Sequence, residues 1–399
     1  MQLSGVWLEE QRDCIGKSVI DVLIAGAGPA GSIAATVLAR AGARVLVLDR
    51  ARFPRPKLCG DTLNPGALRL IDRAGLRAQV EAVSRPLEGM LITGNGGVHV
   101  RGTYGRGLYA RALTRRVLDQ LLVDAAIAAG VQFQDGVRVD GPLVDESAGW
   151  PTVRGAVIGK TGSGASRIRV PAQVTIAADG RHSTLAFGLG LASHPPAPRR
   201  WAVGAYFEGI AGLDTVGEMH VRGPHYIGVA PVGDAGLANV CLVTPSREGF
   251  ADPAGLLDRH VAADRMLGPR AAGARRVTAP SILGPLAVDA RAAGVPGLLL
   301  AGDAAGFVDP MTGDGLRFAI RGAELAADVA LAALENPTID AAGRLAEARA
   351  RAFGTKYGVN RLLRRLVGTP RRVSVMALSA RVAPGILRQM IRYAGDVAA

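Results

Sequence analysis

The feature that most constrains the fold is a glycine-rich turn between two apolar segments near the N-terminus. Residues 19–50 read VIDVLIAGAGPAGSIAATVLARAGARVLVLDR. The apolar run Val19–Ala25 predicts a buried strand, the small residues after Gly31 predict a helix, and Arg44–Leu48 predicts a second strand. A strand, a helix and a strand in this order predict a βαβ unit, so we expect a parallel sheet covered by helices.

Three glycines in this turn have separate physical roles. Gly26 permits a tight turn, Gly28 lets backbone N–H groups approach a pyrophosphate, and Gly31 allows the helix and the strand to pack closely. The helix N-terminus adds a positive dipole for the anion, and Asp49 can accept hydrogen bonds from a ribose. The motif therefore predicts a dinucleotide site without choosing between NAD and FAD. Its candidate residues are Gly26, Gly28, Pro29, Ala30, Gly31, Asp49 and Arg50.

A second motif lies far downstream and favours FAD. In residues 297–331, GLLLAGDAAGFVDPMTGDGLRFAIRGAELAADVAL, the apolar strand Leu298–Ala301 is followed by Gly302 and Asp303, a loop and an Ala-rich helix. This pattern resembles the second flavin fingerprint of FAD-dependent hydroxylases and reductases with the p-hydroxybenzoate hydroxylase fold. The resemblance implies that Asp303 holds the ribityl chain and that the helix directs its N-terminal dipole at the flavin pyrimidine edge. It assigns Asp303, Pro310, Gly313, Gly315 and Leu316 to FAD binding.

Two shorter pieces resemble the same family. There, an arginine at the place of Arg115 reaches the FAD pyrophosphate or ribityl chain, and Arg111 is a rival for that role. By the same resemblance, Leu118 and Asp119 belong to helix packing and capping. An Asp-Gly pair that follows a predicted strand matches the family's central Asp-Gly motif. The resulting FAD candidates are Arg111, Arg115, Asp179 and Gly180, and the resemblance covers about residues 19–335.

The spacing of these motifs predicts an α/β chain with a discontinuous FAD-binding domain. Between Trp201 and Thr244 short apolar runs are separated by Gly, Asp and Pro, which predicts an antiparallel sheet. In the resembling fold this sheet covers the flavin and carries the substrate. The predicted organisation is a Rossmann-like FAD-binding domain at 18–83, 101–190 and 276–335, a substrate-binding β-sheet domain at 84–100 and 191–275, and a helical C-terminal region at 336–399.

The stretch Gly223–Pro231 is the predicted place where substrate meets flavin. Side chains alternate along a strand, so Tyr226, Gly228 and Ala230 share one face and are the candidate substrate contacts. The geranylgeranyl reductase family has Tyr-x-Trp-x-Phe-Pro here, and related halogenases have Trp-x-Trp-x-Ile-Pro. This chain resembles them at Tyr226 and Pro231 but has small residues between, which leaves room for a wide ligand such as a fused aromatic ring. The alternative is that the small residues only allow close sheet packing.

The loop Arg55–Leu68 carries Cys59 and is predicted to border the flavin. It resembles the Arg-x-Lys-x-Cys-Gly-Gly loop of the geranylgeranyl reductase family, with Asp61 in place of the second glycine. A small side chain would let the loop lie close to flavin or substrate, and Cys59→Ala is then expected to retain FAD and most activity. A reactive thiol, with a pKa lowered by Lys57 and Arg55, is the alternative.

Composition argues against several other functions. The formal net charge is +13, but the basic residues are mostly Arg and form no aromatic-interleaved stripe, so nucleic-acid binding is not expected. Three cysteines without paired spacing predict no disulfide framework and no metal site. The glycine-rich stretch 155–164 lacks phosphate-loop spacing and predicts a hairpin turn. Charged residues from Glu9 to Asp13 precede any apolar run, so no secretory signal and a cytoplasmic protein are expected.

Arginines interleave with apolar residues in the C-terminal region. A solvated face on packed helices is the favoured interpretation. A peripheral contact with an anionic membrane, a carrier protein or a lipophilic substrate is the alternative. These arginines are Arg361, Arg364, Arg365, Arg371, Arg372, Arg381, Arg388 and Arg392.

These features and the resemblance favour an FAD-dependent monooxygenase of secondary metabolism that hydroxylates a hydrophobic aromatic or polyketide-like metabolite. The resemblance implies that NAD(P)H binds transiently to reduce the flavin, because no second nucleotide-binding unit occurs, and that O₂ then gives a flavin C4a-hydroperoxide. The main alternative is a geranylgeranyl reductase-like flavoprotein that reduces C=C bonds of a prenyl or other lipophilic substrate. A halogenase and an electron-transfer flavoprotein are less favoured. No catalytic acid or base is assigned; the candidates are Glu208, Glu218, His220, His225 and Tyr226.

Overall fold

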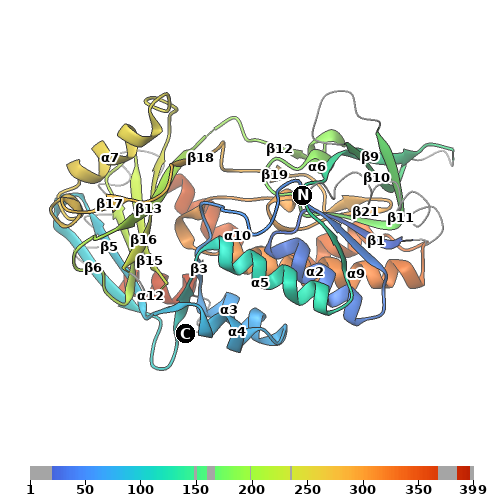
Figure 1. Cartoon of the computed structure of the whole chain (residues 1–399), viewed down its shortest axis with the longest axis horizontal. Coiled ribbons are helices and arrows are strands. Elements are labelled where there is room, and N and C mark those ends of the chain that lie inside the picture. Colours follow the sequence, from blue (N-terminus) through green and yellow to red (C-terminus); the bar gives the residue numbers. More distant parts are fainter. Residues whose placement is uncertain are drawn as a thin grey trace, which may run out of the picture.

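The chain forms two large sheets that lie toward opposite ends of its long axis (Figure 1). They are the mostly parallel sheet of the FAD-binding domain and a second sheet, here called the substrate sheet. The computed structural model describes residues 20–147, 151–159, 167–197, 199–233, 236–366 and 384–395.

The parallel sheet has the strand order β20-β21-β11-β1-β2-β8. Strands β1, β2, β8, β11 and β21 run parallel, which confirms the predicted βαβ unit. Strand β10 pairs antiparallel with β11 and with β9, so residues 155–159 of the predicted hairpin turn belong to β10 itself; residues 160–166 lie outside the described residues. The strands are β1 Ile20–Ala25, β2 Val45–Leu48, β8 Gln132–Gln134, β9 Arg138–Asp145, β10 Thr152–Gly159, β11 Ile168–Ala177, β20 Gly294–Val295 and β21 Leu298–Leu300.

Helices bury the apolar side chains of one face of this sheet. Ile33, Leu118 and Ile320 come from three different helices and meet Ile24 of β1 in one core, which also includes Phe353. The following helices belong to this domain or continue from it: α2 Pro29–Arg40, α3 Pro65–Arg73, α4 Arg77–Ala82, α5 Arg115–Ala128, α6 Thr184–Gly188, α9 Gly315–Glu335 and α10 Ala341–Leu366.

The substrate sheet has the order β17-β13-β16-β15-β14-β5-β6, with β18 also pairing β13. The four runs predicted between Trp201 and Thr244 are strands, as expected. One junction differs from the antiparallel prediction, because β5 and β14 are parallel. These two strands come from separate passages of the chain, so no hairpin fixes their relative direction. The strands are β5 Gly89–Gly94, β6 Val98–Thr103, β13 Trp201–Glu208, β14 Val216–Val221, β15 Tyr226–Val232, β16 Leu237–Thr244, β17 Arg275–Arg276 and β18 Ser281–Leu283, with a short helix η1 at Asn95–Gly97.

The two faces of the substrate sheet have different neighbours. Helices α7 (Pro253–Ala263) and α8 (Gly268–Ala271) pack on the outer face, where Leu242 and Leu257 are fully buried. The inner face is turned toward the FAD-binding domain. Strands β6 and β18 extend this sheet past the boundaries predicted at 101 and 276. Small sheets are formed by β3 Thr62–Leu63, β7 Ala110–Ala112 and β4 Arg85–Leu87, and by β12 Ala192–Ser193 and β19 Asp289–Ala290.

The C-terminal helix α12 (Pro384–Ala394) packs across β6. A Cβ placed on Gly102 of β6 would lie 2.7 Å from Ile391 Cδ1, so this glycine permits the contact. Arg388 and Arg392 are exposed, which agrees equally with a solvated face and with a peripheral contact surface. The predicted arginines at 371, 372 and 381 lie outside the described residues, as do the side chains at 361, 364 and 365. Within the described part of the chain, no helix is both long enough and apolar enough to cross a membrane.

Candidate active site

The glycine turn after β1 is built for the approach of an anion. Gly26 has φ +97°, and a Cβ there would lie 2.5 Å from the carbonyl oxygen of Ala178. A Cβ on Gly31 would lie 1.8 Å from the carbonyl oxygen of Gly26. A Cβ on Gly28, by contrast, meets only guanidinium nitrogens, those of Arg55 at 3.6 Å and Arg115 at 4.0 Å. Gly28 therefore opens onto two cations, as a pyrophosphate site requires.

Buried carboxylates orient these two arginines. Asp119 is fully buried and accepts from Arg115 Nε and Nη2 at 2.7 and 3.0 Å, and it lies 3.1 Å from Arg55 Nη2. Leu118 packs in the core, as the resemblance implied, but Asp119 does not cap α5, because Thr114 is the residue that caps this helix. Asp49 Oδ2 accepts from the backbone N–H of Ala27 at 2.8 Å, which ties the end of β2 to the turn.

Further cations crowd the same place without matching carboxylates. Burial, reinforced by the charge of Arg115, lowers the pKa of Lys57 to about 8, and the carboxylate of Asp303 opposes that effect. Burial also lowers the pKa of Arg181, again with Asp303 opposing. Among the described residues, Arg55 Nε and Arg181 Nε are buried without a hydrogen-bond partner. An anion with several oxygens fits this cluster, so the residues present fit the pyrophosphate of FAD.

Sequence reasoning did not select Arg55, Lys57 or Arg181 as FAD contacts. The signal was present, because Arg55 and Lys57 open the loop that resembles the geranylgeranyl reductase motif. Of the two arginines that it did select as rivals, Arg115 faces Gly28, whereas Arg111 Nη2 pairs with Glu81 at 3.2 Å. The structure thus favours Arg115 for the cofactor.

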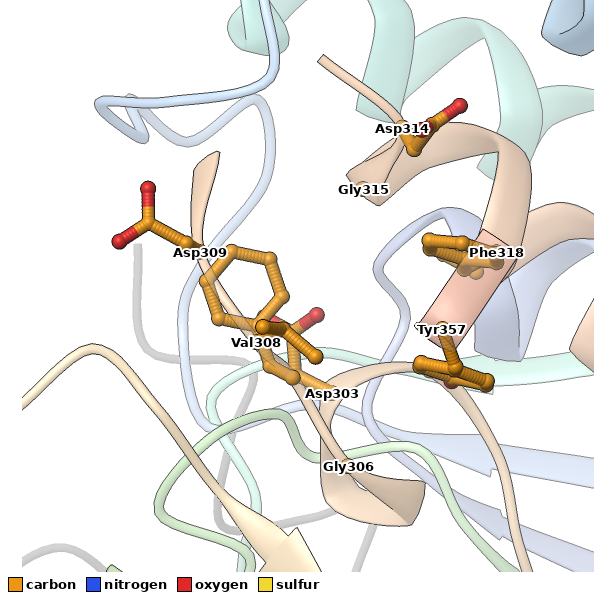
Figure 2. Close-up of a pocket in the computed structure, with 11 residues that line it drawn as sticks. Asp303, Gly306, Val308, Asp309, Asp314, Gly315, Phe318 and Tyr357 are labelled. Atoms are coloured by element: carbon orange, nitrogen blue, oxygen red, sulfur yellow. The ribbon is translucent and has the colours of Figure 1, made fainter. Parts of the chain in front are cut away.

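The second motif forms short turns beside the first. Helices η2 (Gly302–Ala305) and η3 (Pro310–Thr312) precede α9, and a Cβ on Gly302 would lie 2.9 Å from Ala30 Cβ. The two predicted flavin motifs are therefore in contact. Figure 2 shows Asp303 and Gly306 on one side of a small pocket and the stacked rings of Phe318 and Tyr357 on the other, with ring centroids 4.8 Å apart.

Two other predicted residues also border this region. Asp179 Oδ2 accepts from the backbone N–H of Thr184 at 2.7 Å, and burial raises the pKa of its carboxyl. Gly180 has φ +85°, and the packing of Ala178 against Gly26 brings this Asp-Gly turn to the first motif. The predicted FAD contacts that surround the parallel-sheet edge are thus brought together from three parts of the chain.

A larger cavity of about 350 Å³ lies between the flavin motifs and the inner face of the substrate sheet. The loop Cys59–Asp61, the start of α9 at Gly315 and three residues before it line one side; these three are Phe307, Pro310 and Met311. Strands β5, β14, β15 and β16 line the other, and Leu387, Met390, Ile391 and Ala394 of α12 contribute to the wall. The lining is mostly apolar, which suits a lipophilic substrate.

The predicted substrate residues Tyr226, Gly228 and Ala230 all line this cavity. Tyr226 is buried and donates from its hydroxyl to Asp309 Oδ1 at 2.9 Å. A Cβ on Gly228 meets nothing nearer than the carbonyl oxygen of Cys241 at 3.9 Å. Close sheet packing therefore does not require glycine at 228, and its missing side chain leaves space for a ligand.

Of the other acid–base candidates, Glu218 lines the cavity, but its carboxyl group is held by neighbouring side chains, and His220, His225 and Glu208 are not among the lining residues. His225 packs edge-on against His260, with ring centroids 4.8 Å apart. Glu218 is held by His220 at 3.0 Å and by Arg270; burial acts to raise the Glu218 pKa, but these hydrogen bonds lower it overall. Glu208 pairs with Arg275 at 2.6 Å.

Sulfur is concentrated in the cavity wall. Four of the seven methionines and both described cysteines line it, and these are Met90, Met219, Met311, Met390, Cys59 and Cys241. Cys59 has φ +88°, and its carbonyl oxygen accepts from Arg115 Nη1 at 2.9 Å. Burial raises the pKa of the Cys59 thiol, so the lowered pKa of the alternative hypothesis is wrong. The proximity of Cys241 to Cys59 had no sequence signal.

Comparisons with known proteins agree with this site. Residues 19–338 match the FAD binding domain family. Over 327 residues the chain is 30% identical to digeranylgeranylglycerophospholipid reductase 2 of Methanopyrus kandleri, covering 79% of this chain and 78% of the relative.

Two solved structures show the same fold at lower sequence identity. The flavin-dependent brominase Bmp2 has a TM-score of 0.80 at 20% identity and covers 95% of this chain and 94% of its own. A geranylgeranyl bacteriochlorophyll reductase-like protein from Thermoplasma acidophilum has a TM-score of 0.75 at 21% identity. The match covers 93% of this chain and 98% of that protein's chain.

The paired glycine motifs, the cationic cluster and the fold define an FAD-dependent oxidoreductase. Within that class, the chain belongs to the FAD binding domain family and is similar along most of its length to a geranylgeranyl-lipid reductase.

Proposed function

We propose that this protein is an FAD-dependent reductase that adds two hydrogens across a C=C bond of a lipophilic substrate. The similarity to digeranylgeranylglycerophospholipid reductase 2, over 79% of this chain, supports this function. The apolar cavity beside the two flavin motifs supports a hydrocarbon-rich substrate. For these reasons we prefer the reductase interpretation to the monooxygenase that the sequence features favoured.

The observation that carries the proposal is the sulfur-rich lining. Oxygen-dependent flavin chemistry exposes the cavity wall to peroxide, which converts methionine to its sulfoxide and oxidises cysteine. Met219 and Met311 face the same cavity as Cys59 and Cys241. Such a wall suits chemistry that consumes no oxygen. Flexible methionines also adapt to long, irregular apolar substrates.

Cys59 is the proposed proton donor. When bound and reduced, FAD would supply a hydride to one carbon of the double bond. The neutral thiol of Cys59 would give a proton to the other carbon in the same step, so that no carbanion forms, and the thiolate left behind would take a proton from solvent. The raised pKa keeps the thiol protonated at neutral pH.

The backbone at Cys59 supports a role for the thiol itself. Its φ of +88° lies in a region that glycine adopts without strain and other residues adopt at a cost of about 1–3 kcal/mol. A residue selected only for small size would be glycine here. The expectation that Cys59→Ala retains most activity is therefore replaced by an expected loss of turnover with FAD retained.

The test is the oxygen dependence and the product of turnover. Purified holoprotein is mixed with NAD(P)H or dithionite and with digeranylgeranylglycerophospholipid or other polyprenyl compounds, with and without oxygen. The proposal expects products heavier by two hydrogens that also form anaerobically. Turnover that requires oxygen and adds an oxygen atom would overturn it. NAD(P)H as the reductant, and contact of the basic C-terminal region with a membrane or carrier protein, stay predictions.

Hydroxylation of a wide aromatic substrate is the second candidate. The observation in its favour is the open space over Gly228, beside the small Ala230, which widens the cavity at the place where the resembling families have bulky side chains.

A further inference from the structure

A buried carboxyl group lies in the mostly apolar wall of the cavity. Asp61 is 4% exposed and lines the cavity beside Cys59 and Gly60. It stands where the resembling loop motif has glycine, so its carboxyl group is an addition of this chain. A carboxyl group in such a place needs hydrogen-bond donors, because burial without them is strongly unfavourable.

Three donors from three elements converge on Asp61. Oδ1 accepts from the backbone N–H of Arg115 at 2.9 Å, at the start of α5. Oδ2 accepts from the Tyr206 hydroxyl at 2.8 Å and from Asn239 Nδ2 at 2.6 Å. Tyr206 and Asn239 face each other across β13 and β16 on the inner face of the substrate sheet. Burial raises the pKa of Asp61, while these hydrogen bonds oppose that effect.

The hydrogen bond to Asp61 also fixes the Asn239 amide. Because one Nδ2–H points at the carboxyl group, Oδ1 points away from it. Asn239 lines the cavity, and its other cross-strand neighbour is the small Ala230, so space lies beside the amide. Among the described residues no hydrogen-bond donor reaches Asn239 Oδ1. This oxygen is not one of the fully buried polar atoms that lack a partner, so it is an acceptor that a group in the cavity can reach.

We infer that Asp61 and Asn239 form a subsite for a hydroxyl group of the substrate. The inference rests on the proposed function for the surrounding cavity but concerns binding alone. The hydroxyl donates to Asn239 Oδ1, while Asp61 holds the amide in place. A substrate with a phenolic or alcoholic hydroxyl next to an apolar body is therefore preferred over a pure hydrocarbon. A site built to pair a hydroxyl rejects the analogue that lacks it.

The opposite end of the cavity provides an internal control. There Tyr226 donates to Asp309, whose second oxygen lies 3.3 Å from Arg200. Both carboxylate oxygens of Asp309 accept a hydrogen bond, and the Tyr226 hydroxyl already donates its hydrogen to one of them. Removing the Tyr226 hydroxyl should therefore leave hydroxyl recognition at Asn239 unchanged.

The experiment compares 2-naphthol with 2-methylnaphthalene. The two compounds have nearly the same shape, and a methyl group in the second takes the place of the hydroxyl in the first. Each is titrated into oxidised holoprotein, and binding is followed by the flavin difference spectrum. A purely apolar site prefers the methyl compound. We expect the wild-type protein to prefer 2-naphthol by about tenfold, the worth of one hydrogen bond. Asn239→Leu and Asp61→Gly should abolish that preference, and Tyr226→Phe should retain it.

These binding measurements test the inference without any measurement of turnover. Equal binding of the two probes by wild type, no saturable binding of 2-naphthol, or a preference that survives both Asn239→Leu and Asp61→Gly would overturn the inference. If only Tyr226→Phe lost the preference for 2-naphthol, the naphthol hydroxyl would bind at the Tyr226 end of the cavity, and this result would also overturn the inference. FAD content and thermal unfolding of each variant identify any that fail to fold, in which case the remaining Asp61 or Asn239 variant decides. Failure of the C=C reduction test would leave this binding result intact.

Discussion

Glycines in the FAD-binding domain and in the substrate sheet are used for different purposes. Around the first motif, Gly26 and Gly31 have no room for a side chain, because a Cβ would lie 2.5 and 1.8 Å from backbone oxygens. In the substrate sheet, Gly228 has room, with nothing within 3.9 Å. In the space around it, Gly28 is more like Gly228 than like Gly26 or Gly31, because only guanidinium nitrogens would approach a Cβ there. Glycine thus serves packing at some positions and ligand space at others.

The largest expected effect is at a packing glycine. In Gly31→Ala the new methyl group meets the carbonyl oxygen of Gly26. We expect the free energy of unfolding to fall by at least about 2 kcal/mol, because the helix must move away from the strand end. Urea unfolding of the apoprotein measures this change. Wild-type stability in Gly31→Ala would contradict the packing assignment.

At Gly28 we expect stability and FAD binding to separate. Gly28→Ala should change the unfolding free energy of the apoprotein by no more than about 1 kcal/mol, because its φ of −73° suits alanine. Its FAD dissociation constant should rise at least about tenfold, because the methyl group stands where the pyrophosphate approaches. Titration of apoprotein with FAD measures the affinity. Parallel losses of stability and affinity would show that Gly28 also serves packing.

The substrate sheet offers a matched pair of glycines. Gly228→Leu should retain FAD and change stability by less than about 1 kcal/mol, but should block 2-naphthol binding because the leucine fills the cavity. Gly204 lies across β16 on the same face, and a Cβ there would lie 2.6 Å from the carbonyl oxygen of Val240. Gly204→Ala should therefore destabilise the protein more than Gly228→Leu. A larger loss of stability in Gly228→Leu than in Gly204→Ala would contradict the division into packing glycines and glycines that leave ligand space.

The smallest expected effect is a pH dependence at Lys57. Its pKa is lowered from 10.5 to about 8, so the folded apoprotein loses a proton that the unfolded chain keeps between these values. The unfolding free energy of the apoprotein should therefore rise with pH across that window. The FAD pyrophosphate favours the charged lysine, so FAD affinity should fall as pH increases above about 8. FAD titrations at several pH values test this, and Lys57→Met should remove the dependence.

Much of the FAD-binding domain could be predicted from sequence, because its contacts are local. The glycine turn, the strand before it and the acid after the second strand lie within one βαβ unit. The strands of the substrate sheet were also predictable from apolar runs and turn residues. The parallel pairing of β5 and β14 was not, because no turn joins them and periodicity carries no strand direction.

The parts of the site that sequence reasoning missed depend on contacts between distant segments. Cys241 comes close to Cys59 only because β16 faces the loop after β2. Asp61 meets Tyr206 and Asn239 more than 140 residues away. The strand pattern could not decide whether Gly228 serves packing or ligand space, because both roles require a glycine at this position.

The central claim is that Cys59 completes a reduction that FAD begins. The direct measurement is a single anaerobic turnover of dithionite-reduced holoprotein with a polyprenyl substrate in D₂O. The account predicts a product that gains two deuterium atoms, because the Cys59 thiol and the N–H of the dithionite-reduced flavin both exchange with D₂O. It also predicts that Cys59→Ala slows the reaction at least about tenfold with FAD content unchanged. No product without oxygen, or an equal rate in Cys59→Ala, would contradict it.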